Sequence, residues 1–266
     1  MARRVCFCLV LFSLIAAWRS RAQTSGQAAE VRDQQALLLL SQCLKAGGGE
    51  DAFAKIKDFS ATGRITHFWG GREVEAGATM KGRSSEEFRM DSSLREGTRS
   101  IVVAKNSGKI SEQGGRSREL PYHNRLNLGA LNLPFIAILE ALRDPSTSVR
   151  MLGQVSLDGR SVYQIRTQRS FASQGDKDGI LSHLSIKDFF IDTISFLPVS
   201  TRWMTHPSDD YRQEFSQQMT FGDFRALEGV LVPFTVSESI SGQKTWVFRA
   251  DQVKLNQGLL EDAFKP

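Results

Sequence analysis

Hydrophobic residues follow two different periods along this chain. Residues 31–46 place apolar side chains at helical spacing, and three glycines follow, Gly47 to Gly49, which tolerate the left-handed conformation of a helix end. A second short helix is expected over residues 50–57. From Asp58 the period changes to two, and short alternating runs are broken at glycine-rich turns. The pattern predicts two helices followed by antiparallel hairpins.

One strongly apolar segment interrupts the predicted strands. Residues 133–142 contain a single charged side chain, Glu140. Proline at position 134 is tolerated in a first helical turn, and the pair Asp144-Pro145 ends the helix. Because a helix that is apolar nearly all round must be buried on most sides, this segment is predicted to cover the inner face of the sheet.

The second half of the chain predicts long strands with one apolar and one polar face, as at Phe215, Met219 and Phe221. The predicted fold class is mainly β (α+β). It is a large curved antiparallel sheet forming an incomplete β-barrel, covered by the N-terminal helix and the apolar lid helix. The same apolar residues are compatible with a cavity for an apolar ligand or with a fully packed core, and the pattern alone leaves both open.

The first residues have the features of a signal peptide. Arg3-Arg4 precede an apolar run of 14 residues, Val5–Trp18, which is too short for a membrane span of about 20 residues. Ser20 and Ala22 have the spacing that a signal peptidase accepts. We expect a signal peptide over residues 1–22, cleavage after Ala22, and one domain over residues 23–266 in the periplasm or outside the cell. An uncleaved membrane anchor is the alternative.

Charge and cysteine content narrow the function classes. The formal net charge is +5, but four arginines lie in the first 22 residues, and without them 30 basic residues face 29 acidic ones. This balance predicts no nucleic-acid partner. Cleavage would leave Cys43 as the one remaining cysteine, predicted to be a packed core thiol.

Candidate catalytic chemistry is sparse. The four histidines lie in separate segments with no metal-ligand spacing, and no nucleophile elbow or phosphate-binding loop is present. No catalytic residue, metal or cofactor is therefore predicted, and the protein is not expected to be an enzyme. The alternative is an exported hydrolase that uses His183 or His206 with a nearby serine and aspartate.

Several short motifs occur in an order that resembles the LolA/LolB-like periplasmic lipoprotein carriers and the outer-membrane lipoprotein-sorting-like proteins. They are Met80-Lys81-Gly82-Arg83 before Glu87-Phe88-Arg89-Met90, the helix start Leu133-Pro134-Phe135, the hairpin Phe190-Ile191-Asp192 with Leu197-Pro198-Val199, and the tail Leu255-Asn256-Gln257-Gly258-Leu259. The resemblance spans roughly residues 31–266. It implies a half-barrel with an apolar cavity that accepts acyl chains, and a basic residue that holds the lid helix shut. Arg83, with Lys81, is the candidate for this lid latch.

The predicted function is an exported carrier that holds lipid or lipoprotein acyl chains, with envelope membrane proteins as further candidate partners. An envelope protein-interaction scaffold without a lipid cavity is the main alternative. The predicted ligand-lining residues come from the lid helix and from the later strands. They are Phe135, Ile138, Leu139, Leu142, Phe221, Val232, Phe234, Trp246 and Phe248.

Overall fold

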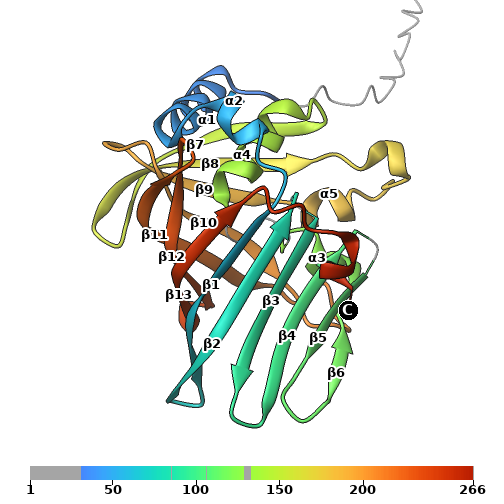
Figure 1. Cartoon of the computed structure of the whole chain (residues 1–266). Helices are drawn as coiled ribbons and strands as arrows, with labels where there is room; N and C mark the ends of the chain where they lie inside the picture. Colours follow the sequence, from blue (N-terminus) through green and yellow to red (C-terminus); the bar gives the residue numbers. More distant parts are fainter. Residues whose placement is uncertain (1–30, 85, 106, 129–132, 266) are drawn as a thin grey trace, which may run out of the picture.

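The computed structural model describes residues 31–84, 86–105, 107–128 and 133–265. The predicted signal peptide and its cleavage site lie outside these residues. Thirteen antiparallel strands form a single open sheet that is not closed into a barrel (Figure 1). The first six strands are β1 (Phe59–Trp69), β2 (Arg72–Arg83), β3 (Glu87–Leu94), β4 (Gly97–Ala104), β5 (Ser107–Ser111) and β6 (Ser117–Glu119). The other seven are β7 (Thr147–Leu157), β8 (Arg160–Arg169), β9 (Lys187–Asp192), β10 (Pro198–Thr205), β11 (Phe215–Leu227), β12 (Val230–Ile240) and β13 (Gln243–Leu255). The fold class predicted from the pattern is confirmed.

The sheet consists of two meanders that meet at one strand pair. Its spatial order is β6-β5-β4-β3-β2-β1-β13-β12-β11-β10-β9-β8-β7, so β1 pairs with β13 and the two meanders end at opposite edges. The chain between β6 and β7 must therefore pass from one edge of the sheet to the other. That connection carries α3 (Tyr122–Arg125) and α4 (Pro134–Arg143).

The helices cover one end of the curved sheet. Figure 1 shows α1 (Gln34–Gly47), α2 (Glu50–Ala54) and α4 together there, while α3 and α5 (Ile180–Leu184) lie to the other side. The Asp33 carboxylate caps α1 by accepting hydrogen bonds from two backbone amides, and Gly48 ends it with a φ of 132°. Two 3₁₀ turns, Ala172–Gln174 and Glu261–Phe264, complete the fold.

The predicted lid helix forms as expected and is buried on most sides. Phe135 and Ile138 of α4 have no exposed surface. The Phe135 ring stacks on Phe53 of α2 at 4.6 Å between ring centroids. A Cβ atom added to Gly47 would lie 2.5 Å from the Phe135 ring, so glycine there allows α1 to approach α4 closely. Cys43 of α1 is fully buried in the same core, and burial raises the pKa of its thiol.

A buried carboxylate lies on the sheet between β8 and β9. Gln164 and Arg166 are half-buried and donate hydrogen bonds to this carboxylate, that of Asp188. Val162, Phe190 and Val199 form a small separate apolar cluster. The second helix ends earlier than predicted, at Ala54. After α2 the chain contacts the C-terminal segment, because the Lys57 backbone amide donates a hydrogen bond to the Asn256 side chain.

The C-terminus of α4 is held by a residue that precedes α1. The Arg32 guanidinium donates to the carbonyl oxygens of Asp144 at 2.6 Å, Leu142 at 2.8 Å and Thr147 at 3.0 Å. These carbonyls include orphan acceptors of the last helical turn, which a cation near a helix C-terminus also favours electrostatically. Arg32 therefore connects the start of the described chain to α4.

We predict that Arg32→Ala lowers the free energy of unfolding by about 2–3 kcal/mol, because half-buried carbonyls lose a charged donor. Arg143→Ala is the matched control, since its ion pair with Glu50 is half exposed on both sides, and it should cost less than about 1 kcal/mol. Urea denaturation of both variants measures the difference. Equal losses would contradict the role assigned to Arg32.

Candidate functional site

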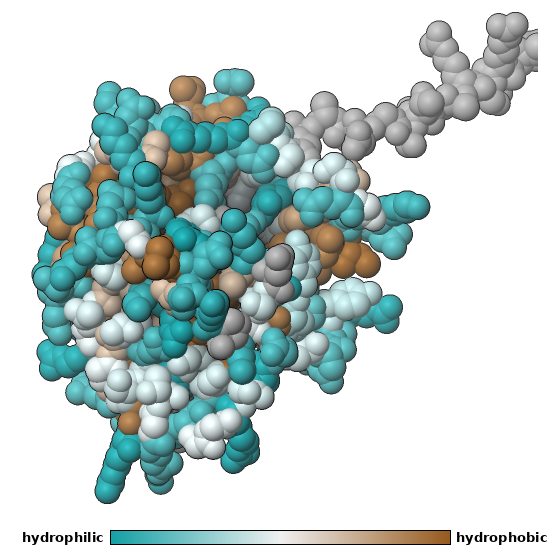
Figure 2. All heavy atoms as spheres, turned by 45° about the vertical axis from the view of Figure 1, so that its right-hand side comes forward, coloured by the Kyte–Doolittle hydropathy of each residue, from teal (hydrophilic) through white to brown (hydrophobic). Residues whose placement is uncertain are grey.

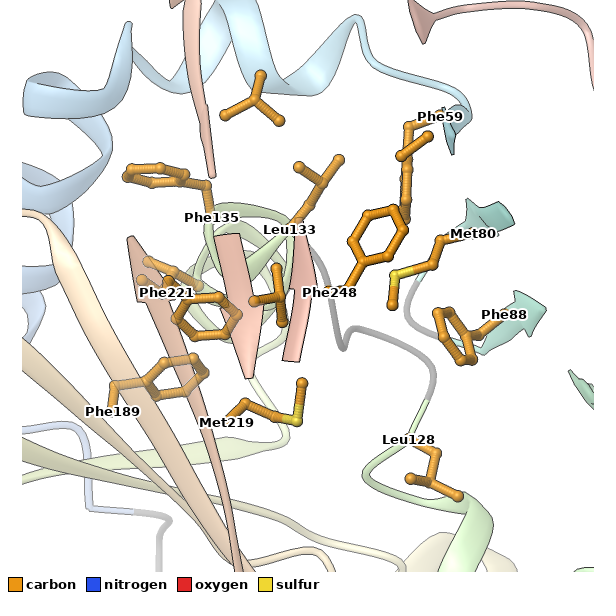
Figure 3. Packing of buried hydrophobic residues seen from close by; sticks show 14 of the residues in the cluster. Phe59, Met80, Phe88, Leu128, Leu133, Phe135, Phe189, Met219, Phe221 and Phe248 are labelled. Carbon is orange, nitrogen blue, oxygen red and sulfur yellow. The ribbon is translucent and has the colours of Figure 1, made fainter. Parts of the chain in front are cut away.

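The core cluster occupies the concave face, where α4 meets both meanders. Figure 3 shows Phe135 of α4 and Leu133, the residue before that helix, together with Phe221, Phe248 and other buried side chains from the strands. This packing does not fill the whole concave face. Pockets open beside the cluster, and two of them have mainly apolar walls.

The larger pocket, here called the strand pocket, has a volume of about 350 Å³. Its walls come from β3 to β6 on one side and from β10 to β13 on the other, with the α3 segment closing one end. Its apolar lining residues are Phe88, Met90, Ile101, Ile110, Leu120, Leu128, Phe215, Ile240 and Trp246. The polar part of its lining comes from Arg99, Arg118, Asn124, Thr205, His206, Ser208, Gln217 and Glu238. A volume above about 300 Å³ that combines apolar walls with polar groups is typical of small-molecule sites.

A carboxyl group lies in the wall of the strand pocket. Glu238 accepts hydrogen bonds from the Gln217 amide, at 2.6 Å, and from the Thr245 hydroxyl. Surrounding protein atoms desolvate this carboxyl and raise its pKa above the ordinary value of 4.5. Burial therefore disfavours the charged form of Glu238.

His206 closes the same pocket near α3. Its backbone amide and carbonyl both bond to the Asn124 side chain, at 3.0 and 2.7 Å, while both ring nitrogens are buried without a hydrogen-bond partner. Burial lowers the pKa of the His206 imidazole, and the charge of His123, whose ring lies 5.7 Å away, lowers it further. The ring consequently contributes to the wall in its neutral form.

The second apolar opening, here called the helix pocket, has a volume of about 220 Å³ and lies between α2, α4 and the ends of β1 and β2. Phe53, Phe59, Leu133, Ile136 and Leu139 give it apolar walls. Arg83 and Glu140 also line it. It opens on the side of the lid helix that faces the C-terminal segment.

The structure brings all nine predicted ligand-lining residues to one core. Phe135, Ile138, Leu139, Phe221, Val232, Trp246 and Phe248 are buried in the cluster, and Leu142 and Phe234 are half-buried against it. Leu139 also lines the helix pocket and Trp246 the strand pocket. The Arg225 guanidinium lies 4.3 Å from the ring centroid of Phe234. A lining role for the nine stays a prediction.

Arg83, the predicted lid latch, is anchored to the C-terminal segment. Its guanidinium donates two hydrogen bonds to Glu87, at 2.6 and 2.8 Å, and one to the Leu259 carbonyl at 3.0 Å. These bonds to Glu87 are the largest cause of its raised pKa. Asp58 accepts three backbone amides of the same segment, from Gln257 to Leu259. Lys81 is half-buried on β2. A latch role for Arg83 and Lys81 stays a prediction.

The residues named for a hydrolase do not form a catalytic arrangement in the described part of the chain. His183 contacts Glu214 at 2.9 Å on the surface, and Ser182 donates to Asp176 instead of to a histidine. His67 bonds to Ser92 at 3.1 Å, and desolvation lowers the pKa of this imidazole to about 4. Within residues 31–265, outside the undescribed gaps, no group of three metal-ligating side chains comes together.

Sequence reasoning missed most of the strand-pocket lining, although one signal was present. Phe88 and Met90 alternate on β3 and share a face, but the motif around them was interpreted only as a family likeness. Glu238 lies in a strand of mixed polarity, and nothing in its neighbourhood marks it as desolvated. Its environment depends on β11 and β13, which pair with it across the sheet.

We predict that Glu238→Gln removes a pH dependence of stability. A carboxyl whose pKa is raised on folding stabilises the native state below its unfolded pKa, and this contribution is lost as pH rises through the folded pKa. The unfolding free energy of the wild type should therefore fall, relative to that of Glu238→Gln, as the pH rises above 4.5. Glu73→Gln, an exposed site on β2, controls for the loss of one negative charge. Parallel pH profiles of wild type and Glu238→Gln would contradict the assignment.

Comparisons with known proteins point to the fold. No family model matches the sequence, and no curated protein matches it. Three solved structures share its architecture. A putative outer membrane lipoprotein-sorting protein domain from Vibrio parahaemolyticus is 12% identical, with a TM-score of 0.52, over 86% of this chain and 96% of that one.

A LolA superfamily protein from Nitrosomonas europaea is 11% identical, with a TM-score of 0.51, over 85% of this chain and 96% of that one. A DUF1329 family protein from Desulfovibrio piger is 9% identical, with a TM-score of 0.50, over 88% and 98%. No helix in the described ranges combines the length and hydropathy that a membrane span requires. The open antiparallel sheet with helices at one end is the fold that this chain shares with these three structures.

Proposed function

We propose that this protein is an exported carrier that binds the acyl chain of a lipid or lipoprotein in the strand pocket. The single observation that supports this most is the pocket itself, an apolar-lined space of about 350 Å³ on the concave face. The helix pocket, about 220 Å³, is a second place where part of a chain can bind. No reaction is needed for this function, only apolar walls and an opening.

The energetics of hydrocarbon transfer favour such a role. Each CH₂ group moved from water to an apolar environment contributes about 0.8 kcal/mol. About ten buried methylene groups would supply the roughly 8 kcal/mol of micromolar affinity, before the cost of ordering the chain is subtracted. The Glu238 carboxyl and the Gln217 amide supply polar groups in the wall that can orient a ligand.

The fold supports an envelope location for this carrier. The structure from Vibrio parahaemolyticus is described as a lipoprotein-sorting domain, and the one from Nitrosomonas europaea as a LolA superfamily protein. By analogy, this chain would receive or deliver its ligand at an envelope membrane. The face of the molecule in Figure 2 suits an aqueous environment, because hydrophilic side chains cover most of it and hydrophobic ones appear in separate patches.

We predict that Ile240→Glu weakens binding of a fluorescent fatty-acid probe at least about tenfold, because it places a carboxylate beside apolar walls. Ile240 lines the strand pocket and is half-buried, so the substitution disturbs the core little. Phe135 is unsuitable for this test because its ring packs on Phe53 and fills the space beside Gly47.

Ile194→Glu is the matched control. This side chain is 88% exposed in the turn between β9 and β10, and the same substitution there should leave probe binding unchanged. Far-ultraviolet circular dichroism and thermal unfolding establish that both variants are folded. Undiminished probe affinity in folded Ile240→Glu would refute the assignment of the strand pocket.

A further inference from the structure

A third opening on the molecule has a different character from the two apolar pockets. Two adjoining hollows, of about 320 and 110 Å³, share Glu86, Leu126 and Arg169 in their walls. Together they form one groove lined by α3, α4, the end of β4 and the ends of β8 and β9. We call it the basic groove, after Arg125, Arg169 and Lys187, which all line it.

The three cations of the basic groove have no carboxylate partner. Among the described residues, no carboxylate oxygen lies within 4.0 Å of their charged nitrogens, whereas Arg83, Arg89, Arg99 and Arg166 all have such partners. Each of the three lies instead over an aromatic ring. The pairs are Arg125 over Tyr122 at 5.3 Å, Arg169 over Phe171 at 5.1 Å and Lys187 over Trp203 at 5.6 Å. A ring face holds a cation in place while leaving its N–H donors unused.

Burial of two of these cationic side chains lowers the stability of the folded protein, and an anionic ligand would offset this loss. The Nε and Nη1 atoms of Arg125 are buried without any hydrogen-bond partner. Buried donors of this kind destabilise the folded protein, more so when charged. Desolvation also lowers the pKa of Lys187 to about 8, so the protein around it disfavours its charge. An anion in the groove would compensate both side chains at once.

Acidic side chains also line the basic groove, and the charges of Asp144 and Glu140 act on Arg169 and Lys187, but neither carboxylate lies within 4.0 Å of their charged nitrogens. The Asp144 carboxylate accepts hydrogen bonds from the Ser146 amide, the Ser146 hydroxyl and the Thr147 hydroxyl, which occupy both of its oxygens. Glu86 is exposed at the rim. Glu140 faces the groove and raises the pKa of Lys187 by its charge, without forming an ion pair with it within 4.0 Å.

The floor of the basic groove is apolar. Ala137 and Ala141 of α4, Leu126 and Phe189 contribute to it. Phe189 belongs to the core cluster, and Figure 3 places it beside Phe221 and Met219. The segment 124–128 separates the basic groove from the strand pocket, because Asn124 and Leu128 line the latter while Leu126 and Asn127 line the former. The groove thus combines unpaired cations with hydrocarbon walls next to the proposed acyl site.

We propose that the basic groove binds the anionic headgroup, a phosphate or carboxylate, of the lipid whose acyl chain the protein carries. Arg125, Arg169 and Lys187 donate to the headgroup oxygens, and the first methylene groups lie on Ala137, Ala141 and Phe189. This inference rests on the proposed function and adds the chemical class of the ligand. Its source is a lipid, since a free anion would make no use of the apolar floor.

The test compares three probes by isothermal titration calorimetry of the full mature chain. They are monododecyl phosphate, dodecanol and inorganic phosphate. Monododecyl phosphate should bind at least about tenfold more tightly than dodecanol, and inorganic phosphate should bind far more weakly than either. Arg169→Gln and Lys187→Gln should each remove most of the advantage of the phosphate probe without changing dodecanol affinity.

Two control variants keep the cation–aromatic geometry but lie outside the groove. Lys244→Gln removes a lysine that lies over Phe68 at 5.7 Å, and Arg225→Gln removes the arginine over Phe234. Neither should affect the phosphate probe. Equal affinity for monododecyl phosphate and dodecanol would overturn the headgroup site but would leave the proposed acyl carrier function intact. If inorganic phosphate binds as tightly as monododecyl phosphate, the ligand of the groove is not a lipid. If the wild type binds neither dodecanol nor monododecyl phosphate, the proposed carrier function is wrong.

Discussion

The connection between β6 and β7 determines the interior of this molecule. The two meanders meet at the β1–β13 pair, so their free ends lie at opposite edges of one curved sheet. The crossing segment that joins these edges carries α4, which packs into the core on the concave face with Phe135 and Ile138 fully buried. The described pockets border this segment: α4 lines the helix pocket and the basic groove, and residues around α3 line the strand pocket.

The contacts that fix the crossing segment in place divide the interior of the molecule into separate spaces. Arg32 binds the C-terminal carbonyls of α4, and Phe135 is fixed between Phe53 and Gly47. On the other side, the Asn124 side chain bonds to the backbone of His206, which ties α3 to the chain after β10. Apolar space on one side of residues 124–128 and unpaired cations on the other follow from this division. An amphiphilic ligand, with one greasy and one charged part, matches such an interior better than a purely apolar one does.

Local features of the fold were predictable from the sequence, and long-range ones were not. Asp33, the glycines from Gly47 and the proline at the start of α4 act on their own helix ends, so pattern and capping rules locate them. The hairpins follow from period-two alternation and glycine turns. Arg32, however, contacts carbonyls more than 100 residues away, and the bonds of Arg83 to Leu259 span 176 residues. No local pattern contains such information.

Only part of the candidate site could be predicted from the sequence, for the same reason. Hydrophobicity identifies Phe221, Val232 and Phe248 as inward-facing, but it does not tell a side chain that fills space from one that borders a void, because both are apolar. In the sequence, Lys187 and Arg169 are ordinary charged residues, and only the fold shows that they line one groove without an ion-pair partner within 4.0 Å.

The most direct test of the central claim is photo-crosslinking with a palmitic acid analogue that carries a diazirine at the end of its chain. If hydrocarbon enters the concave face, mass spectrometry should find the label on peptides that contain strand-pocket residues such as Met90, Ile101 and Trp246. Label confined to exposed apolar side chains, such as Ile194 or Leu260, would show that the interior does not accept the chain.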